Sequence, residues 1–344
     1  MKAWVWEGTD KIRLEKGYPD PVAKPGWVVL KVRAAGVCST DVSIIRGRFG
    51  VWNPPGVLCH EICGEVAELG EGAKGVGVGD RVVVETSVGC GICVKCRTGN
   101  KHLCPEAGEI GFPPFDGGYA EYVAVPDNCC RKMPDAMTDE QGAILEASIC
   151  PFGRLYRNPP QLGANVLVQG VGVAGLSFIQ AAKCLGAKKV IAAGRNLSRL
   201  ADARRFGADL VVNTKERSLD EVVRAETGGL GFDVSIDAAG AAATFDNAIR
   251  LCAAGGVVHL YGIPSAGTKM ALPVDDVIFR QLTICGGTNN ELAWVPLMDL
   301  IARGKFNNAD MVTHRFGFED LPAAIELVDR HPDGLIKAVL NLNN

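Results

Sequence analysis

"NVLVQGVGVAGLSFIQAAKCLGA", residues 165–187, is the stretch that decides the fold. Residues 165–170 form a largely apolar run that predicts a buried strand, and residues 175–187 predict a helix. The turn at residues 170–175 reads "GVGVAG", the pattern G-x-G-x-x-G. This pattern alone is weak in a chain with 42 glycines, but a position between a predicted strand and a predicted helix strengthens it.

The three glycines of this turn predict a dinucleotide site. They let the backbone approach a pyrophosphate, which then rests on the positive end of the helix dipole. The alternative is a tight strand–helix turn that binds nothing. We predict that the cofactor contacts Gly170, Gly172, Val173, Gly175, Gly194, Arg195, Arg199 and Ala238.

The end of the second predicted strand bears on which cofactor is used. A site for NAD places an acidic residue there to accept hydrogen bonds from the ribose hydroxyls. This chain has Gly194 and Arg195 at that position, with Arg199 one helical turn later. A small residue leaves room for a 2′-phosphate, and a guanidinium can pair with it through two hydrogen bonds. The prediction is NADP(H) over NAD(H); the alternative is that Arg195 stacks on adenine and Arg199 is solvated.

The pattern of predicted strands and helices differs on the two sides of residue 160. Downstream, strands such as "KKVIAAG", "FDVSIDAAG" and "VVHLYGI" alternate with helices, which implies right-handed crossovers and a doubly wound parallel sheet. Residues 1 to about 155 instead contain short β-like runs broken by glycine and proline. The tail from 291 reads as a helix, a loop, the helix "LPAAIELVDR" and the strand "KAVLNL".

Composition excludes several classes of partner. The net charge of −3 leaves no basic surplus for nucleic acid or an anionic membrane. The amino terminus has charges among its apolar residues, so we expect no signal peptide. The most apolar run contains Asn165, Gln169 and spaced glycines, which favours a buried strand and helix over a membrane span. The expected location is the cytoplasm, with reduced thiols.

Four of the thirteen cysteines lie in "CGICVKCRTGNKHLC", residues 90–104. In a reducing compartment such clusters bind metals more often than they form disulfides. The last gap of seven residues differs from the C-x3-C-P ending of bacterial ferredoxins, so zinc is favoured over an iron–sulfur cluster. His102 is a weak competitor for ligation. Four thiolates close the coordination sphere, which predicts a structural zinc bound by Cys90, Cys93, Cys96 and Cys104.

A catalytic metal site needs an open coordination position and must lie elsewhere. The segment "GVCSTD" offers Cys38, and "LCHEIC" offers His60 and Glu61; one thiolate and one imidazole would be completed by a third ligand. Such ligands from separate segments can leave a coordination position vacant. The signal is moderate, because a histidine beside a glutamate is often structural and cysteines such as Cys59 and Cys63 are common in cores.

Further motifs follow in order along the chain, and with them it resembles a zinc-dependent alcohol dehydrogenase of the medium-chain dehydrogenase/reductase superfamily, nearest the sorbitol, threonine and butanediol dehydrogenases. The resemblance extends essentially from end to end. The matching stretches are "CSTD" at 38–41, "HEICGEVAELG" at 60–70, "GDRV" at 79–82, the four-cysteine lobe, "PPFDGGYAEY" at 113–122, "ILEA" at 144–147, the glycine turn and "VTHRF" at 312–316.

This resemblance implies an α/β chain with two domains. A GroES-like, β-rich catalytic domain would comprise residues 1–155 and 291–344, with a structural zinc lobe at about 88–106. A Rossmann domain with a doubly wound parallel sheet would comprise residues 156–290. Relatives associate by pairing the edges of the Rossmann sheets, so a homodimer or homotetramer is expected.

The resemblance also implies roles for individual residues. Cys38, His60 and Glu146 would bind the catalytic zinc, with Cys150 as the alternative third ligand although it falls four residues late. Glu61 resembles an acid that can approach the metal in some members.

Two neighbours of Cys38 resemble residues with supporting roles. Thr40 resembles the hydroxyl that takes the substrate's proton. Asp41 would accept a hydrogen bond from His60 and thereby fix the tautomer that binds zinc.

Three departures from the family pattern bear on the substrate. Cys59 replaces the glycine that usually precedes the histidine, and "EASICPFGR" replaces a sequence in which "EPLSV" is followed by a histidine. Thr288-Asn289 stands where the polyol branch has an Arg-Tyr pair. These changes leave the metal ligands in place but put sorbitol itself in doubt. Candidates to line the substrate pocket are Arg48, Phe49, Trp52, Phe115 and Asn289.

The predicted function is reversible oxidation of a secondary alcohol on a polyol, sugar or cyclitol-like molecule, with two zinc ions per chain and NADP(H). The alternatives are a zinc enzyme for a simpler alcohol or aldehyde using NAD(H), a zinc-free enone or quinone reductase, and a nucleotide-binding protein without activity. Partners other than the small-molecule substrate and further copies of the chain are not expected.

Overall fold

The computed structural model describes residues 1–50, 52–265, 267–287 and 289–342. It contains two compact units. Unit 1 comprises Met1–Ala147, Trp294–Gly304 and the chain from Asn308 onward; unit 2 comprises Ser148–Ala293 and Lys305–Asn307. The domain boundaries proposed above, 155/156 and 290/291, stay proposals. Among the described residues no helix is both long and apolar enough to cross a membrane.

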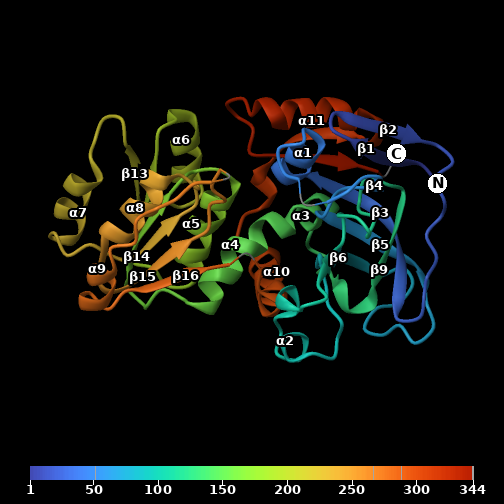
Figure 1. Ribbon diagram of the computed structural model, residues 1–344, viewed down its shortest axis with the longest axis horizontal. Helices are drawn as coiled ribbons and strands as arrows, with labels where there is room; N and C mark the ends of the chain where they lie inside the picture. Colours follow the sequence, from blue (N-terminus) through green and yellow to red (C-terminus); the bar gives the residue numbers. More distant parts are fainter. Residues whose placement is uncertain (51, 266, 288, 343–344) are drawn as a thin grey trace. The chain divides into compact units, whose positions relative to one another are not determined.

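Unit 2 is built on a parallel six-stranded sheet in the order β13-β12-β11-β14-β15-β16. The strands are β11 (Asn165–Gln169), β12 (Lys189–Gly194), β13 (Leu210–Asn213), β14 (Phe232–Asp237), β15 (Cys252–Leu260) and β16 (Thr283–Gly286). The helices are α4 (Leu145–Arg157), which begins in unit 1, α5 (Val173–Cys184), α6 (Leu197–Arg205), α7 (Leu219–Thr227), α8 (Ala242–Arg250) and α9 (Val274–Phe279). Figure 1 shows this sheet with its helices around it.

The strand order of unit 2 follows from the sequence pattern. Each apolar run is short and is followed by a helix, so successive strands are parallel and the helices pack on the sheet. The chain begins at β11, moves outward to β13, and returns beside β11 with β14. Ligands of such sheets bind outside the carboxyl ends of the strands at this reversal. The doubly wound parallel sheet predicted from the sequence is confirmed.

Unit 1 is β-rich and mostly antiparallel. A seven-stranded sheet runs β10-β6-β5-β3-β18-β17, with β9 also paired to β3; β2-β1-β4 and β7-β8 form smaller sheets. The strands are β1 (Ala3–Gly8), β2 (Lys11–Glu15), β3 (Trp27–Val37), β4 (Gly56–Val57), β5 (Ile62–Leu69), β6 (Arg81–Val84), β7 (Ser87–Val88), β8 (Gly108–Glu109), β9 (Tyr122–Pro126), β10 (Cys130–Lys132), β17 (Val312–Gly317) and β18 (Lys337–Asn341). The helices are α1 (Ser39–Ile45), α2 (Val94–Arg97), α3 (Asp139–Ala143), α10 (Trp294–Ala302) and α11 (Leu321–Arg330).

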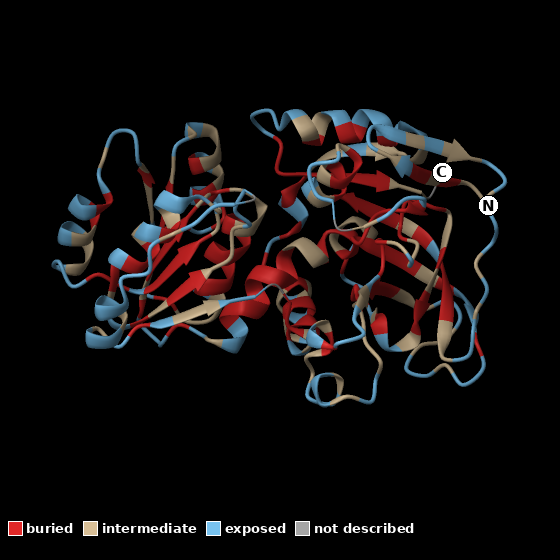
Figure 2. Cartoon of the chain, viewed as in Figure 1, coloured by how far each residue is buried: buried red, intermediate tan, exposed pale blue. Residues whose placement is uncertain are grey.

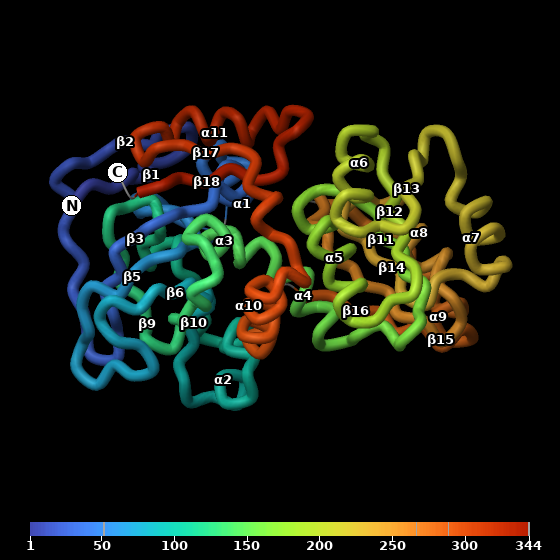
Figure 3. Tube along the Cα trace, turned by 180° about the vertical axis from the view of Figure 1, so that it is seen from behind, coloured from blue at the N-terminus to red at the C-terminus, as the bar shows by residue number. Residues whose placement is uncertain are grey.

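The carboxyl-terminal strands complete the large sheet of unit 1. β18 pairs antiparallel with β3 and parallel with β17, so the end of the chain lies beside an amino-terminal strand (Figure 3). Residues 312–317 were predicted to be part of a loop, and that prediction is wrong. β17 pairs only with β18 among the described strands, and its exposure pattern lacks a clear alternation, so its strand signal depends on the tertiary partner.

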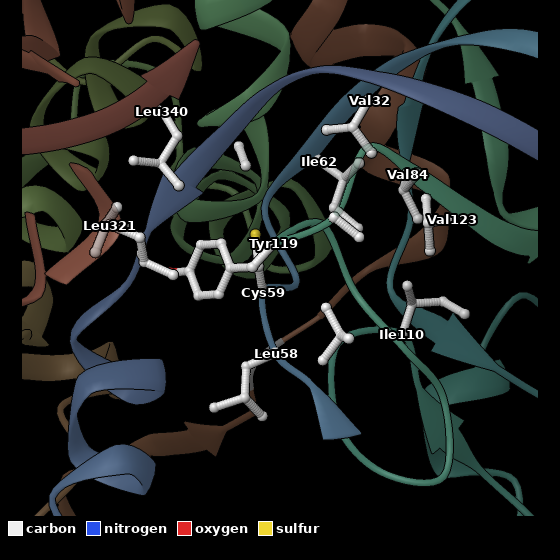
Figure 4. Packing of buried hydrophobic residues seen from close by; sticks show 14 of the residues in the cluster. Val32, Leu58, Cys59, Ile62, Val84, Ile110, Tyr119, Val123, Leu321 and Leu340 are labelled. Carbon is white, nitrogen blue, oxygen red and sulfur yellow. The ribbon is translucent and has the colours of Figure 1, made fainter. Parts of the chain in front are cut away.

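The hydrophobic core of unit 1 lies between the large sheet and the segments that cover it. Figure 4 shows Tyr119 and Cys59 among its buried side chains, with Ile62 and Leu321 nearby. In Figure 2 the strands of both units are largely buried, whereas the outer faces of the helices are exposed. The core therefore fixes the segments on either side of Cys59, which include one predicted metal ligand.

Candidate active site

The first predicted ligand, Cys38, lies at the junction of β3 and α1. It has extended backbone angles (φ −92°, ψ 144°) and is the residue that precedes the helix. The two residues predicted to assist it, Thr40 and Asp41, lie in the first turn of this helix. Thr40 is half-buried and Asp41 is fully buried. The strand-to-helix turn thus places a thiol, a hydroxyl and a carboxylate within four consecutive residues.

His60 is held by a chain of buried polar groups. Its Nδ1 lies 3.1 Å from Asp41 Oδ1, and the Tyr119 hydroxyl donates to Asp41 Oδ2 at 3.1 Å. Burial lowers the pKa of His60, but Asp41 and Cys38 outweigh it and hold that pKa well above its usual value. A carboxylate on Nδ1 directs Nε2 toward a metal. Asp41 was predicted from the sequence, whereas Tyr119 was not.

Glu61 is buried beside the same cluster and forms an ion pair that the sequence analysis missed. Lys337 Nζ, at the start of β18, donates to Glu61 Oε1, and both side chains are at most 6% exposed. Burial opposes the charged amine, yet Glu61 holds the pKa of Lys337 above its usual value. The second oxygen, Glu61 Oε2, has no hydrogen-bond partner among the described residues. That oxygen leaves no room for a side chain at Gly36, whose Cβ would lie 1.9 Å from it.

The predicted catalytic ligands converge in unit 1. Cys38, His60 and Glu61 each offer one ligand atom within 4.8 Å of the others, and Glu146 Oε2 lies 3.8 Å from His60 Nε2. One thiol, one imidazole and carboxylates form a donor set that suits zinc, and the buried oxygen of Glu61 is one more acceptor. Cys150, the alternative ligand, is a buried residue of α4 that falls in unit 2.

The four lobe cysteines converge as well. Cys90, Cys93, Cys96 and Cys104 offer sulfur atoms that all lie within 4.8 Å of one another. Backbone N–H groups of Cys90 and Cys96 point at the sulfurs of Cys104 and Cys93, each at 3.5 Å. Backbone N–H groups lower the pKa of Cys90 to about 7, whereas burial raises the pKa of Cys96 to about 12. The donor set fits a closed tetrahedral zinc site.

The glycine turn of unit 2 forms the cradle that a pyrophosphate needs. Gly175 approaches Gly170 so closely that a Cβ would lie 1.9 Å from the carbonyl oxygen of Gly170. Gly170 has φ +100° and abuts the backbone of Ala238, whereas a Cβ on Gly172 would meet open space. Val173 is the first residue of α5. The turn therefore presents bare backbone at the amino terminus of a helix, a suitable place for phosphate.

A cavity of about 530 Å³ lies beside this turn, at the carboxyl ends of β11 and β12. Its lining includes three of the predicted cofactor contacts, Gly194, Arg195 and Arg199. Arg217 and Arg250, which were not predicted from the sequence, also line the cavity. No described residue that lines the cavity is Asp or Glu.

An aromatic cluster leads to the imidazole of His60. The ring of Phe112 stacks on His60 with centroids 5.0 Å apart, Trp52 stacks on Phe112 at 4.3 Å, and Phe49 lies 5.6 Å from Trp52. Phe49 and Trp52 were predicted pocket residues; Phe112 was missed. The cluster spans from an exposed ring to the ligand set.

The other predicted pocket residues have structural contacts of their own. Arg48 forms an ion pair with Asp329 of α11 at 2.6 Å, and Phe115 packs against the core of unit 1. Asn289 is buried in unit 2, and Thr288 lies outside the described residues. These contacts give Arg48 and Phe115 a role in the fold of unit 1.

Comparison with known proteins agrees with this geometry. Residues 24–135 match the alcohol dehydrogenase GroES-like domain, and residues 172–303 match the zinc-binding dehydrogenase family. Sorbitol dehydrogenase of Bacillus subtilis is 29% identical over 100% of this chain and 98% of its own length. L-threonine 3-dehydrogenase of Pyrococcus horikoshii is 33% identical over 93% of both chains.

A similar solved structure is a putative zinc-binding dehydrogenase from Sinorhizobium meliloti bound to NADP. It is 31% identical, covers 99% of both chains and has a TM-score of 0.89. The matches extend over both units of the fold. They include the segments that carry Cys38 and His60 and the segment that carries the four lobe cysteines. The chain therefore belongs to the zinc-dependent alcohol dehydrogenases of the medium-chain dehydrogenase/reductase superfamily.

Proposed function

We propose that the protein interconverts a secondary alcohol and its ketone by hydride transfer to or from NADP(H), with a polyol, sugar or cyclitol-like substrate. The observation that carries the proposal is the cluster of Cys38, Glu61 and the buried imidazole of His60, which Asp41 orients and whose Nε2 lies 3.8 Å from Glu146 Oε2. When bound, zinc acts as a Lewis acid that lowers the pKa of the alcohol, and the nicotinamide exchanges the hydride.

The residues around the ligands would hold and move the proton. Asp41 and Tyr119 fix the ring of His60, so Nε2 faces the ligand set. Thr40, half-buried on α1 next to Cys38, would accept the substrate's proton through its hydroxyl. Glu61, anchored by Lys337, would hold a buried carboxylate near the ligands. In this proposal Asp41 and Tyr119 orient the imidazole of His60, and Thr40 relays the proton.

The preference for NADP(H) is supported by the charge of the cofactor cavity. Arg195 and Arg199 line it and no described lining residue is acidic, so a ribose hydroxyl has no carboxylate to bind there. The change Arg195→Asp should shift preference toward NAD(H), measured as the ratio of kcat/KM for the two cofactors. An unchanged ratio would contradict this role for Arg195.

The test of the proposed reaction is a screen of alcohols and ketones with NADP(H) and NAD(H), followed by the absorbance of the reduced nicotinamide. Polyols and cyclitols should react faster than primary alcohols of similar size. Metal analysis of the purified protein should find two zinc ions per chain; a single zinc would overturn the catalytic ligand set. Absence of turnover across the screen, with NADPH still bound, would favour the non-catalytic alternative.

A second candidate function is favoured by the aromatic cluster. Phe49, Trp52 and Phe112 form a mostly apolar approach to His60, which suits a simpler, less polar alcohol or aldehyde. The same screen separates the two candidates, because this one predicts a higher kcat/KM for apolar alcohols than for polyols.

We also propose a homo-oligomer located in the cytoplasm. None of the thirteen described cysteines is in a disulfide, which suits a reducing compartment. Strand β16 is an edge of the sheet in unit 2, and nearby α9 exposes Val274, Ile278 and Phe279, the last at 83%. An open edge beside exposed apolar side chains is a typical surface for a second copy. Light scattering of the purified chain should give a dimer or tetramer, and a monomer would contradict the proposal.

A further inference from the structure

We propose that Arg217 binds the 2′-phosphate of NADP(H) together with the two predicted arginines; the proposal rests on the NADP(H) preference proposed above. Arg217 lies in the turn between β13 and α7, whereas Arg195 and Arg199 follow β12. All three line the same cavity. A phosphate in that cavity would therefore be approached by guanidinium groups from two neighbouring strand ends.

The turn that carries Arg217 is tied to the end of β12. Gly194 and Asn213 are paired in the parallel ladder, and Thr214 donates to the Gly194 carbonyl through its N–H at 2.9 Å and through its hydroxyl at 3.2 Å. The backbone N–H of Arg217 donates to the carbonyl of Asn213 at 3.0 Å. These bonds fix the backbone beneath the half-buried Arg217, so part of the ordering cost of a phosphate contact is met before the ligand arrives.

Ion pairing distinguishes Arg217 from the fourth arginine of the cavity. Arg250 is paired with Asp220 and also donates to Asn247 at 3.0 Å. Arg217 has no ion pair among the described residues. The charge of Arg250 is thus neutralised within the protein, and the charge of Arg217 remains for a ligand.

The helix that follows Arg217 does not offer a competing anion site. Ser218 and Glu221 form a reciprocal cap: the Glu221 N–H donates to Ser218 Oγ at 3.2 Å, and Glu221 Oε2 accepts from the Ser218 N–H at 3.3 Å. These bonds occupy two of the free N–H groups of the helix, and Glu221 places a negative charge there. An anion at this edge of the cavity would therefore interact with the guanidinium of Arg217.

The matching ligand is a phosphate monoester, which carries nearly two charges at pH 7. A guanidinium can give such a group two parallel charge-assisted hydrogen bonds. Removal of one such contact costs about 10- to 100-fold in affinity. Because NAD(H) lacks the 2′-phosphate, the loss should affect only the phosphorylated cofactor.

Calorimetric titration of the full-length protein with 2′,5′-ADP and with 5′-AMP tests the proposal without turnover or nicotinamide binding. The variant Arg217→Ala should weaken 2′,5′-ADP binding by about 10- to 100-fold and leave 5′-AMP binding within about twofold. The matched control is Lys215→Ala, which removes one positive charge from the same turn but not from the cavity lining. It should change neither affinity by more than about twofold.

Conservative replacement adds a second criterion. Arg217→Lys keeps the charge but loses the paired donors, so 2′,5′-ADP affinity should fall between wild type and Arg217→Ala. Equal affinities of Arg217→Ala and Lys215→Ala for 2′,5′-ADP would overturn the role of Arg217. If the wild-type protein itself does not prefer 2′,5′-ADP to 5′-AMP, the NADP(H) preference fails first, and that outcome is distinct. A melting curve for each variant identifies any that fail to fold, and Arg217→Gln then replaces the alanine variant.

Discussion

The two cysteine-containing clusters of unit 1 are built in opposite ways. The lobe cluster draws all four ligands from residues 90–104, around the short helix α2 and at the protein surface. The other cluster draws Cys38 from the end of β3, His60 and Glu61 from the segment before β5, and Glu146 from α4. The first can form wherever its loop folds, whereas the second exists only when the β-rich core is assembled.

The two clusters also differ in how far their surroundings are exposed to solvent. The lobe exposes Ile92 at 80% and Val94 at 75% and relies on its thiols for local order. The other cluster is enclosed by Asp41, Tyr119 and Lys337, which are all at most 5% exposed. A metal in the lobe stabilises a loop, and a metal in the buried cluster would act within an environment that the fold has already prepared.

The largest effect is expected for Cys38→Ala. Loss of the thiolate removes one of the few protein ligands of the proposed catalytic zinc, and Lewis-acid stabilisation of several kcal/mol is lost with it. We expect kcat/KM to fall by at least about 1,000-fold and the zinc content to fall from two to one per chain. NADPH affinity, measured by fluorescence, should be unchanged, because the cofactor cavity belongs to unit 2. Cys184→Ala, on α5, is the matched control; residual activity near wild type in Cys38→Ala would refute the ligand role.

A smaller effect is expected for Asp41→Asn. The amide keeps the shape of the carboxylate but not its charge, so the hydrogen bond of 3.1 Å to His60 Nδ1 weakens. Loss of such a partner typically lowers metal affinity or activity by about 10- to 100-fold. Competition with a chelator should show one zinc leaving more readily while the lobe zinc is retained.

Tyr119→Phe provides the graded comparison for Asp41→Asn. It removes only the hydroxyl that donates to Asp41 Oδ2 at 3.1 Å, so the carboxylate still faces His60. The variant should show a smaller loss in the same two measurements. A loss as large as that of Asp41→Asn would mean that the charge of Asp41 is not what holds the imidazole.

Disruption of the lobe by Cys96→Ser should affect activity less than either change above. Among the described residues, the lobe cysteines share no hydrogen bond with Cys38, His60 or Glu61, so kcat/KM should stay within about twofold of wild type. Limited proteolysis should cut residues 88–106 more rapidly, since the thiolate ligands order this segment. A large fall in kcat/KM with the lobe still protected from protease would reverse the proposed roles of the two clusters.

The same contrast explains what could be predicted from the sequence. The lobe ligands are close in sequence, and the alternation of strands and helices in unit 2 is a local pattern, so both are visible without a structure. Lys337 meets Glu61 across 276 residues, and Tyr119 meets Asp41 across 78, because β18 and the segment before β9 pack against β3. Nothing in the local pattern around Lys337 distinguishes it from a solvated lysine. Arg217 was missed for the same reason, since only the pairing of β12 with β13 places it beside Arg195.

The smallest effect is expected at Cys59. Both clusters need a residue with positive φ next to a ligand, but they use different residue types there. Each has a residue with positive φ beside a ligand: Gly91, at φ +75°, follows Cys90, whereas Cys59, at φ +92°, precedes His60. A side chain in this region costs about 1–2 kcal/mol. The Cys59 thiol offsets part of that cost, because it is fully buried and lies 3.4–3.5 Å from the carbonyl oxygens of Glu61 and Gly36.

Two substitutions of Cys59 separate these opposing terms. Cys59→Ala keeps the backbone strain and loses the thiol contacts, so the free energy of unfolding should fall by about 1–2 kcal/mol. Cys59→Gly loses the same contacts and gains entropy in the unfolded state, but it relieves the strain, so its change should be within about 1 kcal/mol of zero. Urea denaturation of both zinc-loaded variants measures the difference. If Cys59→Gly is the less stable of the two, burial of the side chain governs this position, and the positive φ is imposed at little cost by the surrounding core.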